Sequence, residues 1–453
     1  MAGKVVVCDR GTNARVNKSL AVQQAGGAGA IIVNTSNNTQ NDDAHFVPTV
    51  HLSHLDRAAV RSYAAGGAGT AAFSPSVQAQ GVIAPLMATF SSRGPSLASP
   101  NILKPDITAP GVGILAAFSP PLSDAAQRSA QIAAGNIPPP FFDYLQGTSM
   151  ASPHIAGIAA LLKDARPTWS PAAIKSAIMT TASGVKLANG SPDLDRFGYG
   201  AGHANPNPAR NVGLVYDAGF ADYAAFLCGV GVLNPNGSTC NAFGFIAPWN
   251  LNLPSLTSEV VGRQVMQRWV TNVSGNPATF TASVSMPGFS TTVSPSSLTL
   301  PAGATGSFTL TAQRTSATLG SWAFGNLDWT DGQQVVRSPL TLKPLALSSP
   351  NVIEDNRVRA NRIFTVGTGF DGQLKGSSVG LVPATRTNQS VAIGGDNCSR
   401  SINVPAGASA LRVALFDSDT TGNGQDDLDL EIYDAATGQL VGGSGGPTAT
   451  ELV

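Results

Sequence analysis

Residues 147–157 decide the fold of this chain, and they read Gly-Thr-Ser-Met-Ala-Ser-Pro-His-Ile-Ala-Gly. The small residues predict a turn that presents the Ser149 hydroxyl, and a helix begins directly behind it. With Ser149 as the N-cap, Pro153 is the fourth helical residue, where its missing N–H costs no intrahelical hydrogen bond. Apolar residues then recur at helical spacing as far as Leu162. The stretch therefore predicts a rigid helix with Ser149 at its positive end, where a nucleophile beside an oxyanion is favoured.

Two other interpretations of Ser149 compete with this one. Serine is among the preferred N-cap residues, so Ser149 could be a capping residue and nothing more. The Gly-x-Ser-x-Gly nucleophile elbow of α/β-hydrolases also fits, except that Ala151 stands in its last position. That elbow follows a buried strand, whereas Pro-Pro-Pro-Phe-Phe-Asp at 138–143 precedes this serine. The elbow is therefore set aside, and capping stays open for the serine taken alone.

The complete undecapeptide resembles the nucleophile motif of the subtilisin-like serine peptidases, the subtilases. Further segments resemble the same family, and they are most similar to its plant-type branch. These segments are 88–95, 104–112, 197–206 and 213–217. The resemblance covers about the first 345 residues. It implies the C-terminal part of an α/β subtilisin-like core, a partial protease-associated α+β insert and a fibronectin type III-like β-sandwich. A further β-sandwich at the C-terminal end resembles the pre-peptidase type of secreted bacterial peptidases.

Composition limits the class of protein. The 453 residues are enough for three or four domains. Only 12% are charged, with 27 basic and 27 acidic residues, so nothing indicates nucleic acid or an anionic membrane as a partner. No apolar run reaches the length of a membrane span. The 49 glycines and the Ser-Thr-Asn runs favour a loop-rich secreted protein.

The four cysteines are Cys8, Cys228, Cys240 and Cys398. Cys228 and Cys240 flank a Gly-Pro-Asn-rich loop, and closing a loop of that size contributes about 3 kcal/mol in the chain-entropy model. We predict a disulfide between them, which implies an oxidising compartment. The alternative is a pair of buried thiols, and nothing in the sequence pairs Cys8 with Cys398.

Residues 1–77 predict two αβ pieces: strands at 4–8, 30–33, 46–52 and 70–73, a helix at 14–25, and a second helix from Ser53 to Tyr63. The segments 3–11 and 25–30 resemble the protease-associated insert, with its front strands absent. His45, His51 and His54 lie close in sequence, but no Cys or carboxylate falls at zinc-like spacing with them. We therefore expect no metal site there.

The resemblance assigns residues 78–217 to the serine-bearing part of the peptidase domain. A surface loop is expected at 119–143, and a helix at 172–182 with Ser170 as its cap and Pro171 at its first position. Asp106 is a candidate triad acid, but the resemblance makes its Pro-Asp position structural. We therefore predict a carboxylate at a turn or strand end.

The remaining domains are a connecting segment at 218–255, the fibronectin type III-like sandwich at 256–345, a linker at 346–360 and the last sandwich at 361–453. Oxygen-bearing residues crowd the loop from Asp417 to Asp429 and could hold calcium. The EF-hand pattern fails there because Leu428 occupies its twelfth position. A solvated turn without calcium is therefore preferred, and no cofactor is expected.

A serine hydroxyl needs a base and an orienting carboxylate to act as a nucleophile. In subtilases these residues precede the serine, and the plant-type arrangement also places them, with an oxyanion Asn, before the insert. His154 lies about 140° around the helix and about 7.5 Å along it from Ser149, so it faces elsewhere. His203 matches a structural segment of the family. The His, Asp and Asn are thus expected upstream of Met1, in an N-terminal part that the given sequence lacks.

The sequence therefore predicts a secreted serine endopeptidase that cleaves protein or peptide substrates through an acyl-enzyme on Ser149. By itself the chain is expected to be inactive because the triad His and Asp are absent. The alternative is a non-catalytic binding or scaffold fragment, made of the insert and the sandwiches. An upstream coding sequence with a signal peptide and the triad residues would favour the enzyme.

Overall fold

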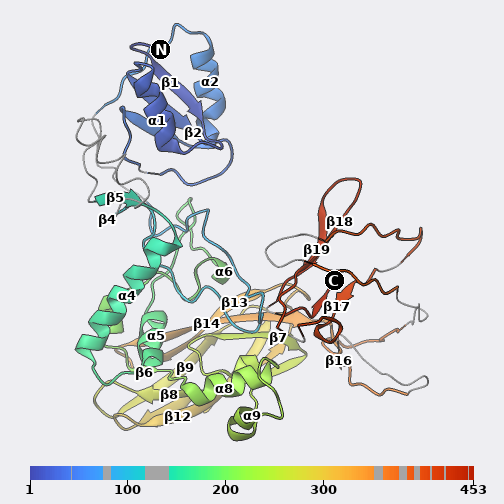
Figure 1. Cartoon of the computed structure of the whole chain (residues 1–453). Coiled ribbons are helices and arrows are strands. Elements are labelled where there is room, and N and C mark those ends of the chain that lie inside the picture. Colours follow the sequence, from blue (N-terminus) through green and yellow to red (C-terminus); the bar gives the residue numbers. More distant parts are fainter. Residues whose placement is uncertain are drawn as a thin grey trace. The chain divides into compact units, whose positions relative to one another are not determined.

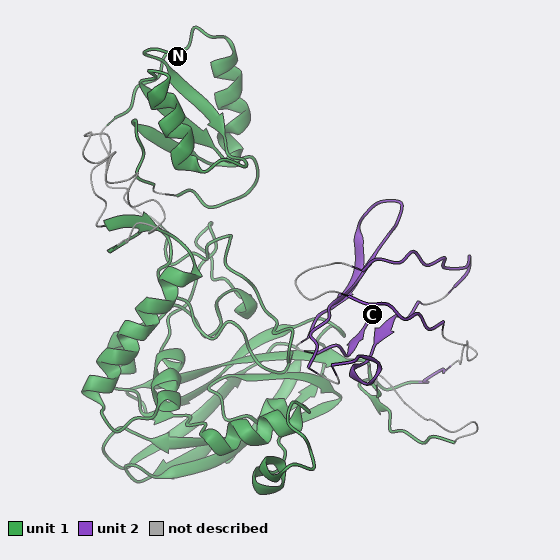
Figure 2. Cartoon of the chain, viewed as in Figure 1, with its two compact units in different colours: residues 1–372 green, residues 373–453 purple. Residues whose placement is uncertain are grey.

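The computed structural model divides the chain into two compact units, residues 1–372 and 373–453 (Figure 2). It describes residues 1–41, 43–74, 83–117, 142–350, 361–376, 385–391, 398–408, 411–422, 425–446 and 448–453. Most of the loop expected at 119–143 and most of the linker expected at 346–360 lie outside these ranges. Among the described residues, we find no helix with the length and apolar character needed to cross a membrane.

Residues 1–74 fold around a three-stranded parallel sheet in the order β1-β2-β3 (Figure 1). The elements are β1 Val5–Asp9, α1 Arg15–Gln24, β2 Gly29–Val33, β3 Thr49–Leu52, the 3₁₀ turn η1 His54–Asp56 and α2 Arg57–Ala65. Val22 of α1 packs in the core with Ala30, Ile32 and Val33 of the central strand β2. Ser53 caps the turn, since its Oγ accepts a hydrogen bond from the Leu55 N–H. The two predicted αβ pieces are confirmed in these elements.

The closing strand predicted at 70–73 is wrong. Thr70 uses both of its backbone groups on one side chain: its N–H donates to the Tyr63 hydroxyl and its C=O accepts from that hydroxyl, both at 3.0 Å. Both backbone groups of Thr70 are thus satisfied without a neighbouring strand. The third strand also starts at Thr49, later than predicted, because the Phe46 N–H donates to Ser19 Oγ and Pro48 has no N–H.

The part that carries the serine helix contains few strands among its described residues. Its elements are β4 Ile114–Ala117, β5 Phe142–Leu145, α4 Thr148–Ala165, α5 Pro171–Thr180, α6 Arg196–Tyr199 and α7 Pro206–Ala209. Helix α5 begins as predicted, with Ser170 Oγ accepting from the Ala173 N–H at 3.0 Å and Pro171 at the first helical position. Seven of the ten residues of α5 are buried, so this helix lies in the core.

Residues 218–255 hold the helices α8 Phe220–Gly229 and α9 Ser238–Phe243 and the 3₁₀ turn η3 Pro248–Asn250. The predicted disulfide is confirmed: Cys228 and Cys240 are bonded, with their Cα atoms 5.6 Å apart, and it joins α8 to α9. Both cysteines are buried. Cys8 and Cys398 are free thiols.

This pairing predicts the outcome of thiol labelling. In the unfolded chain without reductant, an alkylating probe is expected to label Cys8 and Cys398 only. Adding reductant exposes the other two thiols, and Cys228→Ser is expected to lower the free energy of unfolding of this segment by about 3 kcal/mol. Mass spectrometry of the alkylated peptides checks the pairing, and alkylated Cys228 without reductant would contradict it.

Residues 214–345 contain two facing antiparallel-rich sheets, in the orders β10-β12-β8-β6 and β11-β9-β13-β14-β7 (Figure 1). Their strands are β6 Leu214–Val215, β7 Leu256–Val261, β8 Arg263–Asn272, β9 Ala278–Ser285, β10 Phe289–Ser294, β11 Ser297–Leu300, β12 Thr305–Arg314, β13 Ala323–Thr330 and β14 Val335–Leu345. Strand β6 lies before the predicted sandwich and pairs with β8. Burial alternates along β8, where Met266, Arg268, Val270 and Asn272 are buried. The predicted alternation of apolar and polar residues is incomplete there, because two of these four residues are polar and Val265 and Trp269 are exposed.

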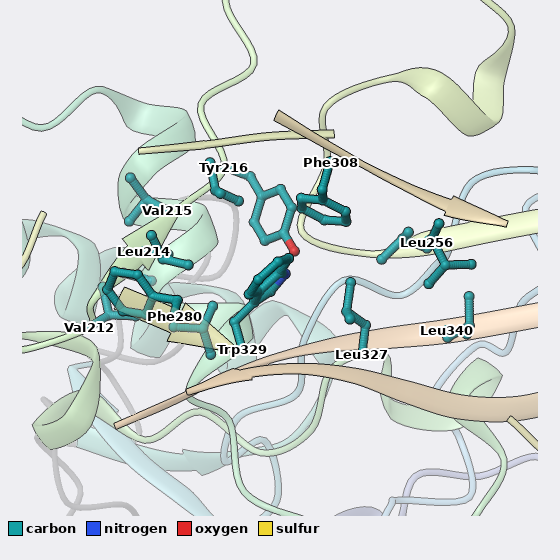
Figure 3. Packing of buried hydrophobic residues seen from close by; sticks show 14 of the residues in the cluster. Val212, Leu214, Val215, Tyr216, Leu256, Phe280, Phe308, Leu327, Trp329 and Leu340 are labelled. Carbon is teal, nitrogen blue, oxygen red and sulfur yellow. The ribbon is translucent and has the colours of Figure 1, made fainter. Parts of the chain in front are cut away.

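Aromatic rings fill the centre of this sandwich (Figure 3). Phe308 packs edge-on against Trp329 and Tyr216, with ring centroids 5.1 and 6.5 Å apart. The Tyr216 hydroxyl hydrogen-bonds Ser338 Oγ at 2.8 Å, and burial raises the pKa of Tyr216 to about 12. Tyr216 lies directly after β6, so the end of the serine-bearing part is built into the sandwich core.

A buried guanidinium ties the segment before β7 to the sandwich. Arg268 on β8 is only 1% exposed. Its donors reach the carbonyl oxygens of Trp249, Leu253, Ser255 and Gln267, at 2.7–3.0 Å. Burial lowers the pKa of Arg268 to about 10, so the group is still charged at neutral pH. The carbonyls take the place of a carboxylate partner.

The last part of the chain shows only short strand pairs among its described residues. The pairs are β15 Leu347–Ser348 with β16 Gly367–Thr368, β17 Ala414–Leu415 with β20 Glu451–Leu452, and β18 Leu430–Tyr433 with β19 Leu440–Ser444. Two strands predicted within 411–417 and 428–433 are confirmed as β17 and β18. A complete second sandwich stays a prediction.

Candidate active site

Ser149 lies in the first turn of α4, with its side chain exposed to solvent. The helix starts at Thr148, and Gly147 is its N-cap, so the prediction that Ser149 caps the helix is wrong. The reason is the backbone of Gly147, whose φ of 150° is a conformation that only glycine adopts readily. The Gly147 C=O accepts from the Met150 N–H at 3.0 Å. Ser149 Oγ has no hydrogen bond to any other described residue, so the pure capping interpretation is also wrong.

The position of Pro153 changes with the helix start. Pro153 lies inside α4, two residues further from the start of the helix than predicted. Because proline has no N–H, the Ser149 C=O lacks its intrahelical donor. The Ser149 N–H belongs to the first turn, whose N–H groups have no intrahelical acceptor. Both the hydroxyl and the amide of Ser149 are thus free of helix bonding. This is the arrangement that an oxyanion hole beside a nucleophile requires.

The predicted apolar face of α4 meets the core. Ile155, Ile158 and Ala159 pack against the main hydrophobic cluster, and Leu162 is buried in it. The opposite face is also apolar but exposed among the described residues, with Ala156, Gly157, Ala160 and Leu161 on it. Leu161 is 69% exposed.

The turn before Ser149 is held from one neighbouring segment. The Gly147 N–H donates to the Gly111 C=O at 2.9 Å, next to the Ile114–Leu145 end of the β4–β5 pair. The same segment is fixed at Thr108, whose N–H donates to the Gly202 C=O and whose C=O accepts from the Ala204 N–H. A Cβ on Gly111 would lie 2.9 Å from the Gly147 carbonyl oxygen. Sequence reasoning did not single out Gly111, and its only signal is the Ala-Pro-Gly run within a family-like segment.

Asp106 is placed in a structural ion-pair network. Its Oδ2 lies 2.6 Å from Lys104 Nζ and its Oδ1 lies 3.0 Å from Lys175 Nζ on α5. Its C=O accepts from the Ala201 N–H. Both carboxylate oxygens are therefore engaged with lysines, as expected for a structural carboxylate and not for one that orients an imidazole.

All five histidines of the chain are described, and no ring among them hydrogen-bonds Ser149. His154 Nδ1 bonds the Met150 C=O at 2.8 Å, on its own helix. His203 exchanges both backbone hydrogen bonds with Ser183, and burial lowers the pKa of its ring. No histidine ring in the described part of the chain is therefore bonded to the serine hydroxyl.

The ring nitrogens of His45 and His51 are used in hydrogen bonds to Ser19, Asn34 and Asn41. No group of three His, Cys, Asp or Glu side chains suited to a metal ion occurs in the part of the chain that is described. In the Asp417–Asp429 loop, Asp419 pairs with Arg386, and Asp426 accepts from the Gly422 N–H. Asn423 of the calcium prediction lies outside the described residues.

Because no such group of three occurs among the described residues, we predict that calcium does not stabilise the chain. Differential scanning calorimetry in calcium and in EDTA is expected to give the same melting temperatures. A calcium-dependent rise of several degrees in the transition of residues 373–453, removed by Asp426→Asn, would show that the loop binds the ion.

Comparison with known proteins identifies the family. Residues 4–202 match the Subtilase family and residues 250–342 match a fibronectin type-III domain. Subtilisin-like proteases SBT5.3 and SBT1.7 of Arabidopsis thaliana are 39% and 38% identical over 75% of this chain. Glyma18g48580 of Glycine max, another subtilisin-like protease, is 39% identical over 75% of it. These matches take in 46%, 47% and 47% of the relatives, so the chain spans about half their length. With the nucleophile motif at Ser149 and the sandwich behind it, the chain belongs to the subtilase family, in the plant-type arrangement with a fibronectin type-III-like domain.

Proposed function

We propose that this chain is the serine-bearing part of a secreted subtilisin-like endopeptidase, and that Ser149 is its nucleophile. One observation carries the proposal: the Ser149 hydroxyl is exposed at the N-terminal turn of an 18-residue helix, within the segment matched to the subtilase family. Substrates are then proteins or peptides. Secretion is supported by the buried disulfide, which needs an oxidising compartment to form.

In the proposed reaction, Ser149 Oγ attacks the carbonyl carbon of the scissile peptide while a base removes its proton. The negative charge on the carbonyl oxygen is stabilised by the Ser149 N–H and by the positive end of α4. The amine leaves with the proton, and water hydrolyses the acyl-serine by the same route. We assign the base, its aspartate and the second oxyanion donor to polypeptide outside residues 1–453, consistent with relatives twice as long.

The proposed organisation follows the family. We assign residues 1–77 to a protease-associated insert, 78–217 to the peptidase domain and 218–255 to the connecting segment. The fibronectin type III-like domain occupies 256–345, and after a linker at 346–360 the last domain runs from 361 to 453.

Labelling with a fluorophosphonate tests the function. Residues 1–453 alone are compared with a fusion in which the amino-terminal half of SBT5.3 precedes residue 4. We expect labelling of the fusion at least about 10³-fold faster, since the fusion supplies a base. Equally rapid labelling of residues 1–453 alone would show an internal base. A folded fusion that is not labelled would favour the non-catalytic fragment.

Gly111→Ala is a sharp probe of the nucleophile turn. Gly111 has no positive φ, so the substitution acts only through its Cβ, which would press on the Gly147 carbonyl and on the Ala151 Cβ at 3.3 Å. We expect the labelling rate of the fusion to fall by about 10²-fold, as displacements near 1 Å can do. Gly184→Ala is the matched control because its Cβ meets nothing within 4 Å, and its rate should stay unchanged. An unchanged rate in Gly111→Ala would contradict the positioning role.

A further inference from the structure

His51 on β3 is held by hydrogen bonds at both ring nitrogens. Its Nδ1 accepts from the Asn41 backbone N–H at 2.9 Å. Its Nε2 lies 2.8 Å from Asn34 Oδ1. The Asn34 amide is oriented by its Nδ2, which donates to the Asn38 C=O, so Oδ1 faces the ring as an acceptor. The ring is therefore neutral, with its hydrogen on Nε2.

These contacts close the loop of residues 34–41 that follows β2. The loop has few other anchors on β3: Gln40 Nε2 donates to the His51 C=O, and the Asn34 N–H donates to the Leu52 C=O. Asn34 is fully buried and Asn41 is 5% exposed, so water does not replace a lost partner there without opening the loop. Thr39 of this loop also hydrogen-bonds Thr89 through its hydroxyl.

The surroundings oppose a positive charge on His51. Arg10 donates to Asn34 Oδ1, the atom that also bonds the His51 ring. Arg15 pairs with Asp43, and His45 lies 4.0 Å from that carboxylate. Among the described residues, the guanidinium groups of Arg10 and Arg15 therefore disfavour a protonated His51 ring, and the carboxylate of Asp43 favours it.

We propose that His51 is an acid-sensitive latch, whose protonation at Nδ1 breaks the hydrogen bond from Asn41 and releases the 34–41 loop from β3. A proton added to Nδ1 lies where the Asn41 N–H points. The Nδ1–H and the Asn41 N–H are then two donors that face each other, and no hydrogen bond forms between them. No water bridge relieves this contact while Asn41 stays buried. The inference does not depend on the proposed peptidase function.

The sign of the pH dependence follows from the lowered pKa of His51. Burial is the largest cause and Arg15 and Arg10 add to it, while smaller opposing contributions leave the pKa below its ordinary value. A group with a depressed folded pKa is neutral in the closed state and takes up a proton on opening. The closed state is therefore favoured fully above the ordinary pKa of 6.5, and this preference is lost as the pH falls below it. The open population rises by up to about tenfold per pH unit in that window.

Hydrogen exchange of the Asn41 amide in the full chain tests the latch. After correction for the intrinsic pH dependence of exchange, opening is expected to rise by about tenfold or more between about pH 7.5 and about pH 5. His51→Asn keeps an acceptor oxygen near the position of Nδ1 and does not titrate, so its corrected rate should be independent of pH. His54 lies just after β3 and its ring has no hydrogen bond to a described residue. His54→Asn should therefore keep the full pH dependence of opening. His45→Asn should keep it as well, because His45 bonds Ser19 and not the loop amide.

A wild-type rate without pH dependence, or the same dependence in His51→Asn, would overturn the proposal. If His51→Asn does not fold, the ring-nitrogen chemical shifts of His51 in the wild-type chain test the proposal instead. They are expected to show the tautomer with hydrogen on Nε2 near neutral pH. Hydrogen on Nδ1 would exclude the bond from Asn41 and with it the latch.

Discussion

Replacing Ser149 with alanine in the fusion with the SBT5.3 amino-terminal half is expected to lower kcat for peptide hydrolysis by about 10⁶-fold. That is the loss found for the triad serine of subtilisin, a member of the same family. The substitution removes the one atom that forms the acyl-enzyme in the proposed reaction. It leaves the helix intact, because Ser149 neither caps α4 nor hydrogen-bonds another described residue. KM is expected to change little, since the hydroxyl contributes to the transition state and not to ground-state binding.

Initial rates on a fluorogenic peptide measure this effect. Ser152→Ala serves as the control because Ser152 is an exposed serine on the same helix, almost one turn further on. Its kcat should stay within about tenfold of the parent, while its thermal unfolding matches that of Ser149→Ala. Residual activity of a hundredth or more in Ser149→Ala would show that another residue carries the acyl group.

Replacing Arg268 with alanine is expected to give the largest loss of stability in the sandwich, about 3–5 kcal/mol. Arg268 is fully buried, and its removal leaves the carbonyls of Trp249, Leu253 and Ser255 without their donor. Each buried carbonyl that loses its partner costs about 1–3 kcal/mol, and a cavity is left as well. The segment that connects the disulfide-linked helices to β7 then detaches from β8.

Denaturant unfolding followed by tryptophan fluorescence measures this change, since Trp329 is buried in the same sandwich. Arg263→Ala on the same strand removes an exposed guanidinium and should cost less than about 0.5 kcal/mol. Arg268→Lys keeps the charge but not the planar set of donors. Its loss of stability is therefore expected to lie between those of Arg268→Ala and Arg263→Ala. A loss in Arg268→Ala no larger than that in Arg263→Ala would contradict the role of Arg268.

Local patterns in the sequence predict much of this fold. Alternation and turn residues place the strands of the sandwich, and Ser170 with Pro171 places the start of α5. Cysteine spacing gives the disulfide. In each case the deciding interaction lies within a few residues of the signal, or depends on which face of a strand is buried.

The errors and omissions occur where a side-chain contact without a sequence pattern decides how the backbone is hydrogen-bonded. The Tyr63 hydroxyl takes the hydrogen bonds of Thr70 and removes a predicted strand. Four carbonyls around Arg268 solvate a charge that the sequence shows only as an arginine in a strand. Neither interaction has a periodic signal, because each depends on packing between elements.

At the candidate site too, sequence patterns predict some features and not others. The motif identifies Ser149 and the buried face of its helix, but the helix start depends on one dihedral angle of Gly147. The contact of Gly111 with Gly147 joins the segment before β4 to the segment after β5, and the sequence carries no pattern for this contact. The motif thus singles out Ser149, and the structure shows which residues hold the turn before it.

Tandem mass spectrometry of the fluorophosphonate-labelled fusion tests the central claim most directly. The account predicts one adduct, on Ser149, in the peptide that contains residues 147–157. An adduct on any other residue of a folded, labelled protein would contradict it.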